Sequence, residues 1–340
     1  MKQSSPTSTL IRDGVLKIAA NPRSNPGHLN FEAYTLPLIQ DDYPARTAAM
    51  WNGAYAEFQM PFGNVMLAGD PANAPQILQA FRNDPKYLGG GAGVGFKEAL
   101  LPHLDELDER ARLTGSVNFI AKQANGALRG YNSDGLGFLR GVEEALALRG
   151  ETVARKRAVL LGAGGTASAV AFALVEHGCR IVILNRTVAR ARALAERINA
   201  YLGKTLAQFG PEEDLESIAG TADLVINLST KGSSAELAEY SALAPAILPA
   251  TAENISRNLT GTERVWSVLA KQALLCDVVL SSQETPFLRE ARVRGFTTLN
   301  GVAMVIHQGV AAFWILHAQR LNEKGILKSR VAEVMRAYAG

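Results

Sequence analysis

The sequence contains little cysteine, little histidine and no cluster of basic residues. Its 340 residues include only two cysteines, Cys179 and Cys276, and neither lies in a CxxC pair. Two isolated thiols cannot form a disulfide framework, so we expect a reducing, cytoplasmic compartment. The five histidines are dispersed, and none occurs in an HExxH or similar spacing, which argues against a metal enzyme.

Other absences exclude further classes of protein. The net charge is only +3 and the basic residues are scattered, whereas nucleic-acid readers gather lysine and arginine on one face. We therefore expect no nucleic-acid partner. The G-x-S-x-G elbow of a Ser-His-Asp hydrolase is missing. The first 30 residues are polar and lack the apolar segment of a secretory signal, so they are interpreted as a loosely ordered extension.

The apolar residues predict a two-domain α/β protein. The uncharged run 158–175 has the length of a membrane span, but it contains glycine, serine and threonine and lies between strand-like segments, so we expect no membrane partner. From residue 157 onward, "RAVLLG", "CRIVILNR", "ADLVINLS" and "LLCDVVLS" alternate with helical segments. This alternation is typical of a doubly wound parallel sheet of the Rossmann type.

The predicted domain boundaries follow from this pattern. We expect an N-terminal extension over 1–30, a smaller α/β substrate-binding and catalytic domain over 31–130 plus 300–340, and a nucleotide-binding Rossmann domain over 131–299. The last part of the smaller domain comes from the long apolar helix after residue 299, which does not fit a strand–helix unit and is expected to return to the first lobe.

A glycine-rich stretch, "VLLGAGGTASAV", indicates a dinucleotide site. Gly162, Gly164 and Ala167 fit the pattern G-x-G-x-x-G/A, directly after a strand and opening a helix. The first glycine permits a tight turn, the second lets a pyrophosphate approach the backbone, and the small third residue lets helix pack on strand. The alternative is a turn that serves packing alone. The predicted contacts of the turn are Gly162, Ala163, Gly164, Gly165, Thr166 and Ala167.

The end of the next strand favours NADP over NAD. An NAD site usually carries an acidic residue there, which would repel a 2′-phosphate. Here the chain reads Asn185-Arg186-Thr187, followed by Arg190 one helical turn later. A guanidinium attracts a phosphate and can pair with it through two hydrogen bonds.

A second glycine-rich stretch, "GGGAGVGFKEALLPH" at 89–103, does not make a phosphate-binding P-loop. Phe96 stands where that loop needs its lysine, and Glu98 stands where it needs Ser or Thr. The glycines are instead expected to let the backbone approach another group, while Lys97 projects from the start of a helix. A lysine there is suited to proton transfer, although a surface lysine is the alternative.

Six segments in the same order resemble the shikimate dehydrogenases, including quinate-using and shikimate-dehydrogenase-like members. They are "FKEALLPHLDELDERARLTGSVNFI", "RGYNSDGLGFLRGVEEAL", "VLLGAGGTASAVAFAL", "ILNRTVARARALA", "DLVINLSTKG" and "CDVVLSSQETPFLREARVRGFTTLNGVAMVIHQG". The resemblance covers about residues 85–320.

The resemblance implies hydride transfer between a ring alcohol and NADP in a monomer or homodimer with a small-molecule substrate. Lys97 and Asp134 would form the catalytic acid–base pair, although Asp134 also stands where a helix N-cap is expected. Asn118 and Gln308 would bind substrate hydroxyls, unless they are ordinary polar residues of the cleft wall. Further cofactor contacts implied by the resemblance are Asn227, Leu228, Ser229 and Gly301.

The departures from the family gather on one side of the substrate. Where the family has Ser-x-Ser-Pro for the substrate carboxylate, the preferred register places Ala45–Ala48, with Arg46 and Thr47; the other register places "DDYP" there. The family's Asn-Val-Thr-x-Pro is replaced by the glycine-rich residues 91–95, which would shape a different pocket. We therefore expect shikimate to be a poor substrate and a related cyclic alcohol or ring acid to be preferred. The alternatives are an authentic shikimate or quinate dehydrogenase, or a catalytically silent NADP-binding sensor.

Overall fold

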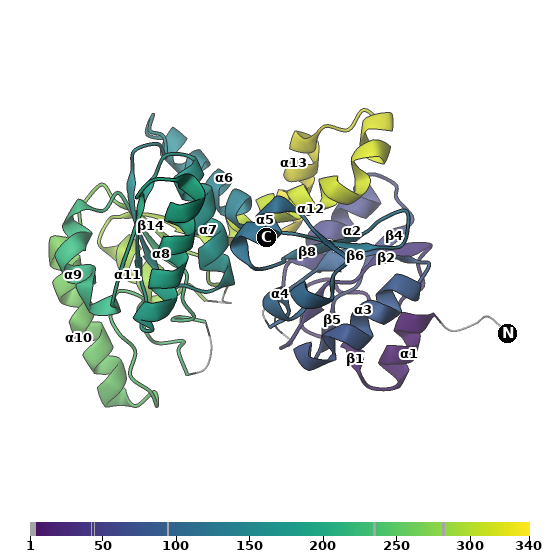
Figure 1. The fold of residues 1–340 in the computed structure, drawn as a ribbon, viewed down its shortest axis with the longest axis horizontal. Coiled ribbons are helices and arrows are strands. Elements are labelled where there is room, and N and C mark those ends of the chain that lie inside the picture. Colours follow the sequence, from purple (N-terminus) through teal and green to yellow (C-terminus); the bar gives the residue numbers. More distant parts are fainter. Residues whose placement is uncertain (1–4, 42, 44, 94, 234–235, 281–282) are drawn as a thin grey trace. The chain divides into compact units, whose positions relative to one another are not determined.

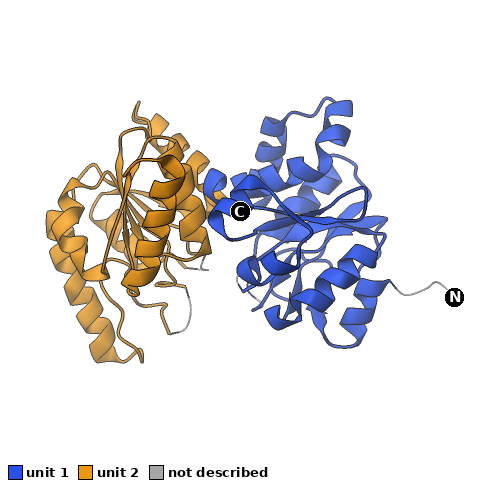
Figure 2. Ribbon diagram, in the orientation of Figure 1, with its two compact units in different colours: residues 1–137, 305–340 blue, residues 138–304 orange. Residues whose placement is uncertain are grey.

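The computed structural model describes residues 5–41, 43, 45–93, 95–233, 236–280 and 283–340 (Figure 1). They form two compact units, which Figure 2 colours separately. Unit 1 comprises Met1–Gly137 and Val305–Gly340, and unit 2 comprises Phe138–Met304. Both points at which the chain passes from one unit to the other lie a few residues later than the sequence predicts. Residues 131–137 therefore belong to unit 1 and residues 300–304 to unit 2, and Asp134 shares a unit with Lys97.

Unit 2 is built on a six-stranded parallel sheet, as predicted. Its strand order is β12-β11-β10-β13-β14-β15, which is the order 3-2-1-4-5-6 of a dinucleotide-binding fold. The strands are β10 (Arg157–Leu161), β11 (Arg180–Leu184), β12 (Ala207–Gly210), β13 (Leu224–Asn227), β14 (Leu274–Asp277) and β15 (Thr297–Asn300). In such sheets a ligand binds at the carboxyl ends of the strands where the order reverses, which here lies between β10 and β13.

Helices follow the strands of unit 2 and cover the sheet. They are α6 (Asp134–Ala147), which begins in unit 1, α7 (Gly165–Glu176), α8 (Val188–Leu202), α9 (Leu215–Ile218), α10 (Ala252–Val268) and α11 (Pro286–Val293). Every residue of α7 from Ala167 to Val175 is buried. A central helix on a sheet that is covered on both faces must be apolar all round, and this explains the uncharged run 158–175.

Unit 1 contains two smaller sheets. The six-stranded sheet has the order β4-β2-β6-β8-β9-β7 and the three-stranded sheet the order β1-β5-β3. The strands are β1 (Leu16–Ile18), β2 (Ala33–Thr35), β3 (Leu38–Ile39), β4 (Phe62–Asn64), β5 (Leu67–Gly69), β6 (Tyr87–Gly91), β7 (Glu106–Leu107), β8 (Phe119–Lys122) and β9 (Leu128–Tyr131). The helices are α1 (Pro6–Arg12), α2 (Thr47–Glu57), α3 (Ala74–Asn83), α4 (Phe96–Ala99), α5 (Glu109–Thr114), α12 (Gly301–Glu323) and α13 (Lys328–Tyr338).

The start of the chain is part of unit 1 and not a loose extension. The Ser5 side chain caps α1 by accepting a hydrogen bond from the Ser8 N–H, and β1 pairs antiparallel with β5. Leu10 and Leu16 belong to the main apolar core of the unit. The prediction of a loosely ordered extension is therefore wrong for residues 5–30. A polar composition hides these two short elements, each of which buries only one or two large side chains.

Helix α12 is the long apolar helix that the sequence predicts. Among the described residues it alone has the length and composition of a membrane span. Half of its most apolar window is buried within the protein, and Phe313 packs edge-on against Trp51 of α2. The core helix of a soluble protein passes the same test of length and composition, so α12 is weak evidence for a membrane.

His317 of α12 should make the protein sensitive to acid. It is buried, its Nε2 lies 3.2 Å from the Tyr55 hydroxyl, and burial, with a smaller effect of Arg320, lowers its pKa to about 4. In the unfolded chain the His317 imidazole has a pKa near 6.5. The contribution of the neutral imidazole to folding stability is therefore complete above about pH 6.5 and is lost as the pH falls toward 4. We expect a loss of ~3 kcal/mol.

The measurement is urea unfolding of the wild type and of His317→Gln across this pH range. Glutamine keeps a polar group near Tyr55 but does not titrate. As the pH falls, the unfolding free energy of the wild type should decrease by more than that of His317→Gln. A difference that does not change with pH would show that His317 titrates alike in both states.

Candidate active site

Lys97 and Asp134 form an ion pair within unit 1. Phe96, the first residue of α4, is fully buried and anchors this short helix, while the Lys97 side chain remains 21% exposed. Its Nζ donates a hydrogen bond to Oδ2 of Asp134, whose side chain is only 1% exposed. Asp134 is the first residue of α6, where the helix dipole stabilises a carboxylate. The ammonium can thus meet a ligand from outside, while the carboxylate is held inside.

Asn118 joins this pair to Gln308. The Asn118 Nδ2 lies 2.9 Å from Oδ1 of Asp134 and 2.7 Å from Oε1 of Gln308. The Asn118 Oδ1 accepts a hydrogen bond of 3.0 Å from the Ser133 N–H. The structure therefore brings together four of the side chains that the sequence predicts for catalysis and substrate binding. They come from α4, from the residue just before β8, from α6 and from α12.

The main chain and Asn132 hold these side chains in place. The Val117 N–H donates to the Lys97 carbonyl oxygen at 2.9 Å. Asn132, which is buried, donates to the Ser116 Oγ at 2.8 Å and accepts from the Asp134 N–H at 3.1 Å. These contacts make Asn132 a positioning residue for Asp134.

Sequence reasoning missed Tyr43 and Ser133 as members of the site. Burial raises the pKa of Tyr43, and the charge of Asp134 raises it further. Tyr43 lies in the "DDYP" segment, whose neighbours Asp42 and Pro44 fall outside the described residues. Ser133 was visible in the sequence only as part of the Tyr-Asn-Ser-Asp segment. Its side chain contacts both Asn118 and the Gln308 carbonyl oxygen.

The glycines before Lys97 serve packing within unit 1, so the prediction that they shape a substrate pocket is wrong for most of them. A Cβ on Gly89 or Gly90 would strike the carbonyl oxygen of Ile120 or Leu36. One on Gly93 would lie 2.9 Å from Ile39, and Gly95 has a φ of +87° that disfavours other residues. Only Gly91 has ordinary clearance, 3.6 Å from Pro37. Val94 lies outside the described residues.

Arg46 makes hydrogen bonds to the two residues that follow the last helix, α13. Its guanidinium donates to the carbonyl oxygen of Ala339, and to that of Gly340 at 2.7 Å. Arg23 donates to the same Gly340 oxygen, and burial together with the charge of Arg23 lowers the pKa of Arg46. Thr47 is the half-buried first residue of α2. The role of Arg46 and Thr47 as substrate contacts stays a prediction.

The first turn of the unit 2 sheet has the shape of a dinucleotide cradle. Gly162 adopts a φ of +125°, and a Cβ on it would lie 2.7 Å from the Leu228 carbonyl oxygen. Gly164 is the N-cap residue of α7 and has no side-chain cap, and a Cβ on it would meet nothing within 4 Å. Ala167 is fully buried against the sheet. The turn thus leaves open space beside the N-terminus of α7, where a phosphate is favoured, and Ala163, Gly165 and Thr166 line the same turn.

The end of β11 offers a positive charge to a second phosphate. Arg186, Thr187 and Arg190 are exposed, and Asn185 is half-buried. Asn185 Nδ2 donates to the Thr187 carbonyl oxygen at 2.9 Å, which shapes the turn into α8. Thr187 is the N-cap residue of α8, but its side chain makes no cap hydrogen bond. These residues fit the 2′-phosphate of NADP by charge and by place.

The end of β13 is held by Asn227. Its Oδ1 accepts from the Ser229 N–H at 3.0 Å, and its Nδ2 donates to Asp277 at 3.0 Å. Burial raises the pKa of Asp277 to about 6 against its hydrogen bonds with Val279, Thr285 and Asn227. Asn227 thus orients the turn that carries Leu228 and Ser229. Gly301 is the first residue of α12, and a Cβ added to it would lie 2.7 Å from the Val278 carbonyl oxygen. Cofactor contacts by these residues stay predictions.

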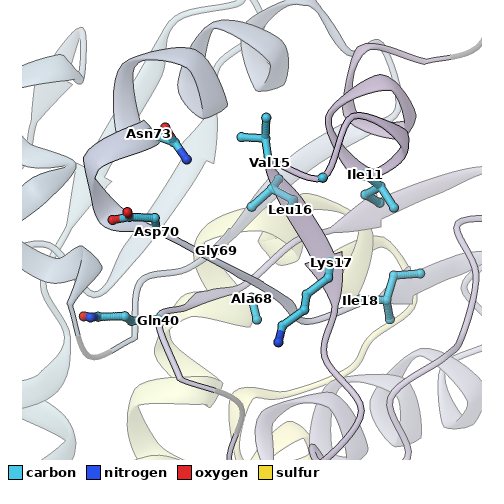
Figure 3. A pocket seen from close by; sticks show the side chains of 11 residues that line it. Ile11, Val15, Leu16, Lys17, Ile18, Gln40, Ala68, Gly69, Asp70 and Asn73 are labelled. Carbon is cyan, nitrogen blue, oxygen red and sulfur yellow. The ribbon is translucent and has the colours of Figure 1, made fainter.

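A cavity of about 690 Å³ beside β1 lies apart from the predicted site residues. Figure 3 shows Leu16, Lys17 and Ile18 of β1 on one side and Asp70 and Asn73 on the other. None of the residues predicted for catalysis or cofactor binding lines it. Among the described residues no group of three or more His, Cys, Asp or Glu side chains is placed to hold a metal.

Two family models match the chain. The model described as shikimate / quinate 5-dehydrogenase matches residues 144–246, and that of the shikimate dehydrogenase substrate binding domain matches residues 44–120. The chain is 35% identical over 274 residues to the shikimate dehydrogenase (NADP(+)) of Moorella thermoacetica, a match that covers 80% of this chain and 82% of that protein.

Two further relatives differ in the cofactor or the substrate that they are named for. The quinate/shikimate dehydrogenase (NAD(+)) of Corynebacterium glutamicum is 36% identical over 242 residues, or 70% of this chain and 76% of that protein. The solved structure of the ligand-free 5-ketofructose reductase of a Gluconobacter species superposes with a TM-score of 0.66 at 25% identity, over 91% of this chain and 99% of that one.

Proposed function

The chain belongs to the shikimate dehydrogenase family, and we propose that it is an NADP-dependent dehydrogenase of a cyclic alcohol with Lys97 and Asp134 as its acid–base pair. The observation that carries this proposal is the cluster of Lys97, Asp134, Asn118 and Gln308 in unit 1. These residues come from separate segments of the sequence, and their meeting at one place is what acid–base chemistry on a polyhydroxylated ring requires.

The Lys97–Asp134 pair would accept and return the proton of the reacting hydroxyl. Bound NADP supplies the acceptor of the hydride. The partly exposed Lys97 ammonium first releases a proton to solvent, and the neutral amine then takes the hydroxyl proton as the carbon–hydrogen bond breaks. In the reverse direction the ammonium donates that proton to the forming alkoxide. The buried Asp134 carboxylate orients Nζ and balances the charge of the ammonium that forms. Asn118 and Gln308 donate to and accept from the remaining ring hydroxyls, and their mutual hydrogen bond holds the two amides in place before the substrate binds.

NADP would be held by three turns of unit 2. The turn at Gly162–Ala167 and the N-terminus of α7 suit the pyrophosphate, and Arg186 and Arg190 suit the 2′-phosphate. The turn at Asn227–Ser229 and Gly301 would complete the site. Support for NADP comes from this arginine-rich strand end and from the relative in Moorella thermoacetica, which is named for that cofactor.

Shikimate is proposed to be a poor substrate. The resemblance places Ala45–Ala48 where the family has the Ser-x-Ser-Pro that binds the substrate carboxylate, and it places Gly91 and Gly93 where the family has Asn and Thr. Arg46, in the first of these segments, is engaged with Ala339 and Gly340. Each lost hydrogen-bonding partner costs ~0.5–1.5 kcal/mol. The relative that is named for reduction of 5-ketofructose supports a substrate other than shikimate within this architecture. The proposed class is a cyclic polyol or hydroxylated ring acid, with Arg46 and Thr47 near its distal end.

Steady-state assays test the proposal. Shikimate, quinate and a panel of cyclic polyols should be offered with NADP and with NAD, and the appearance of reduced nicotinamide followed. We expect turnover with NADP and a kcat/KM for shikimate at least about tenfold below that for the best substrate, because at least one of the lost contacts costs ~1.4 kcal/mol. A kcat/KM highest for shikimate or quinate would identify an authentic enzyme of those acids.

A further inference from the structure

A buried ion pair lies beside the strand end that is expected to receive the 2′-phosphate. The Nζ of Lys231 is 2.8 Å from Oε2 of Glu212, and the two side chains are only 9% and 15% exposed. The same Nζ donates to the Ala244 carbonyl oxygen at 2.8 Å. Lys231 is therefore a fixed charge and not a mobile surface lysine.

Sheet register places Glu212 and Arg186 just beyond the ends of two neighbouring strands. Strands β11 and β12 are parallel, and Leu184 at the end of β11 pairs with Gly210 at the end of β12. The Asn185 N–H donates to the Gly210 carbonyl oxygen at 3.2 Å. Both strands therefore end at the same level of the sheet, and Arg186 and Glu212 each lie two residues beyond the paired ends. The acidic residue Glu212 thus follows the strand beside β11, although the residues that directly follow β11 itself include no acidic one.

An unpaired carboxylate at this place would oppose NADP. It would repel the 2′-phosphate, and it would compete with that phosphate for the Arg186 guanidinium. Lys231 prevents both effects, because its Nζ holds the Glu212 carboxylate and neutralises it. Burial lowers the pKa of Lys231; the Glu212 carboxylate opposes this shift and the charge of Arg186 adds to it.

The pair reaches across the sheet edge. Lys231 follows β13, and β10 and β11 lie between β13 and β12. Its backbone is fixed by the β13 turn, since Asn227 Nδ2 donates to the Lys231 carbonyl oxygen at 3.1 Å. The acceptor of Lys231, the Ala244 carbonyl, also receives Asn258 Nδ2 at 2.9 Å. This support holds Lys231 in place independently of any nucleotide.

We propose that Lys231 determines cofactor preference: by binding Glu212 it leaves Arg186 available to the 2′-phosphate and so favours NADP over NAD. The inference rests on the proposed function, because it assumes that the Arg186 strand end receives the adenosine ribose. Lys231 acts through Glu212 as a positioning residue and does not itself contact the phosphate. The relatives in Moorella thermoacetica and Corynebacterium glutamicum are named for different cofactors, so cofactor preference differs between members of the family.

Calorimetric titration of the full chain with NADP, NAD and 2′,5′-ADP tests the proposal without turnover. Lys231→Met leaves Glu212 unpaired and should weaken NADP and 2′,5′-ADP binding about tenfold, the order expected for one uncompensated charge. NAD binding should stay within about twofold. The double variant Lys231→Met/Glu212→Gln removes both charges and should bind NADP within about threefold of the wild type. The single variant Glu212→Gln should bind NADP at least as well as the wild type.

Several results would overturn the proposal. An equal loss of NAD and NADP in Lys231→Met would make the pair structural, and no loss at all would make it irrelevant to the cofactor. A double variant that still fails to bind NADP would show that Lys231 contacts the phosphate directly. If Lys231→Met does not fold, the double variant alone decides, because the proposal requires its preference for NADP to persist. A wild-type chain that binds neither nucleotide would refute the proposed function, whereas a wild type that binds NADP confines any failure to Lys231.

Discussion

Replacement of Lys97 by methionine should lower kcat by a factor of about 10²–10⁴, the usual contribution of a positioned acid or base. Methionine keeps most of the side-chain volume and removes the ammonium, so Asp134 and Asn118 should keep their places. The affinity for NADP should remain that of the wild type, because the predicted cofactor residues lie in unit 2. The measurement is the initial rate with the best ring alcohol, together with a titration of NADP.

Lys122→Met provides the matched control. Lys122 is a partly buried lysine of the same unit, and its Nζ binds the Asp84 carbonyl oxygen at 2.8 Å. It has no part in the proposed site, so its loss should leave kcat within about twofold of the wild type. Equal effects of the two substitutions, or an active Lys97→Met, would remove Lys97 from the chemistry and favour a nucleotide-binding sensor.

A valine at Gly164 should abolish cofactor binding without unfolding the protein. Gly164 has an ordinary extended backbone conformation, with φ −90° and ψ −171°, and no atom lies within 4 Å of an added Cβ. The folded chain therefore accepts the side chain, whereas a pyrophosphate at the α7 N-terminus does not. We expect the melting temperature to change by no more than ~2 °C and the Kd for NADP to rise by at least about 100-fold, because the close approach of phosphate to backbone is lost.

Two other glycines make this prediction specific. Gly27→Val is the matched control, because Gly27 also has no atom within 4 Å of an added Cβ, and it should change neither property. Gly162→Ala should behave differently from both, because its φ of +125° and the Leu228 carbonyl oxygen at 2.7 Å make it costly for folding itself. Normal NADP binding by Gly164→Val would mean that the pyrophosphate lies elsewhere.

The architecture of unit 2 follows from its sequence pattern for a physical reason. Strands covered on both faces read as continuous apolar runs, and a glycine turn between such a strand and a helix has few other uses. The predicted strands at "RAVLLG", "CRIVILNR" and "ADLVINLS" are therefore β10, β11 and β13. In the same way, Lys97 and Asp134 stand out because each lies in the first turn of a helix.

Contacts between distant segments could not be predicted from the sequence. Gly90 is constrained by the backbone of Leu36, and a one-dimensional pattern does not show which strand lies beside which. For the same reason the sequence does not show that Arg46 donates hydrogen bonds to the Ala339 and Gly340 carbonyl oxygens. The ion pair of Lys231 and Glu212 depends on two strand ends that β10 and β11 separate.

Chemical rescue of Lys97→Ala tests the central claim most directly. The Lys97 side chain is partly exposed, so its removal should leave a channel that a small primary amine can enter. If the lysine amine moves the hydroxyl proton, added methylamine or ethylamine should restore turnover in proportion to the concentration of amine, and amines of higher pKa should act faster. Rescue should be absent for the same amines in Asp134→Ala. A Lys97→Ala protein that binds NADP, yet is not restored by any amine while the wild type turns over, would contradict the account.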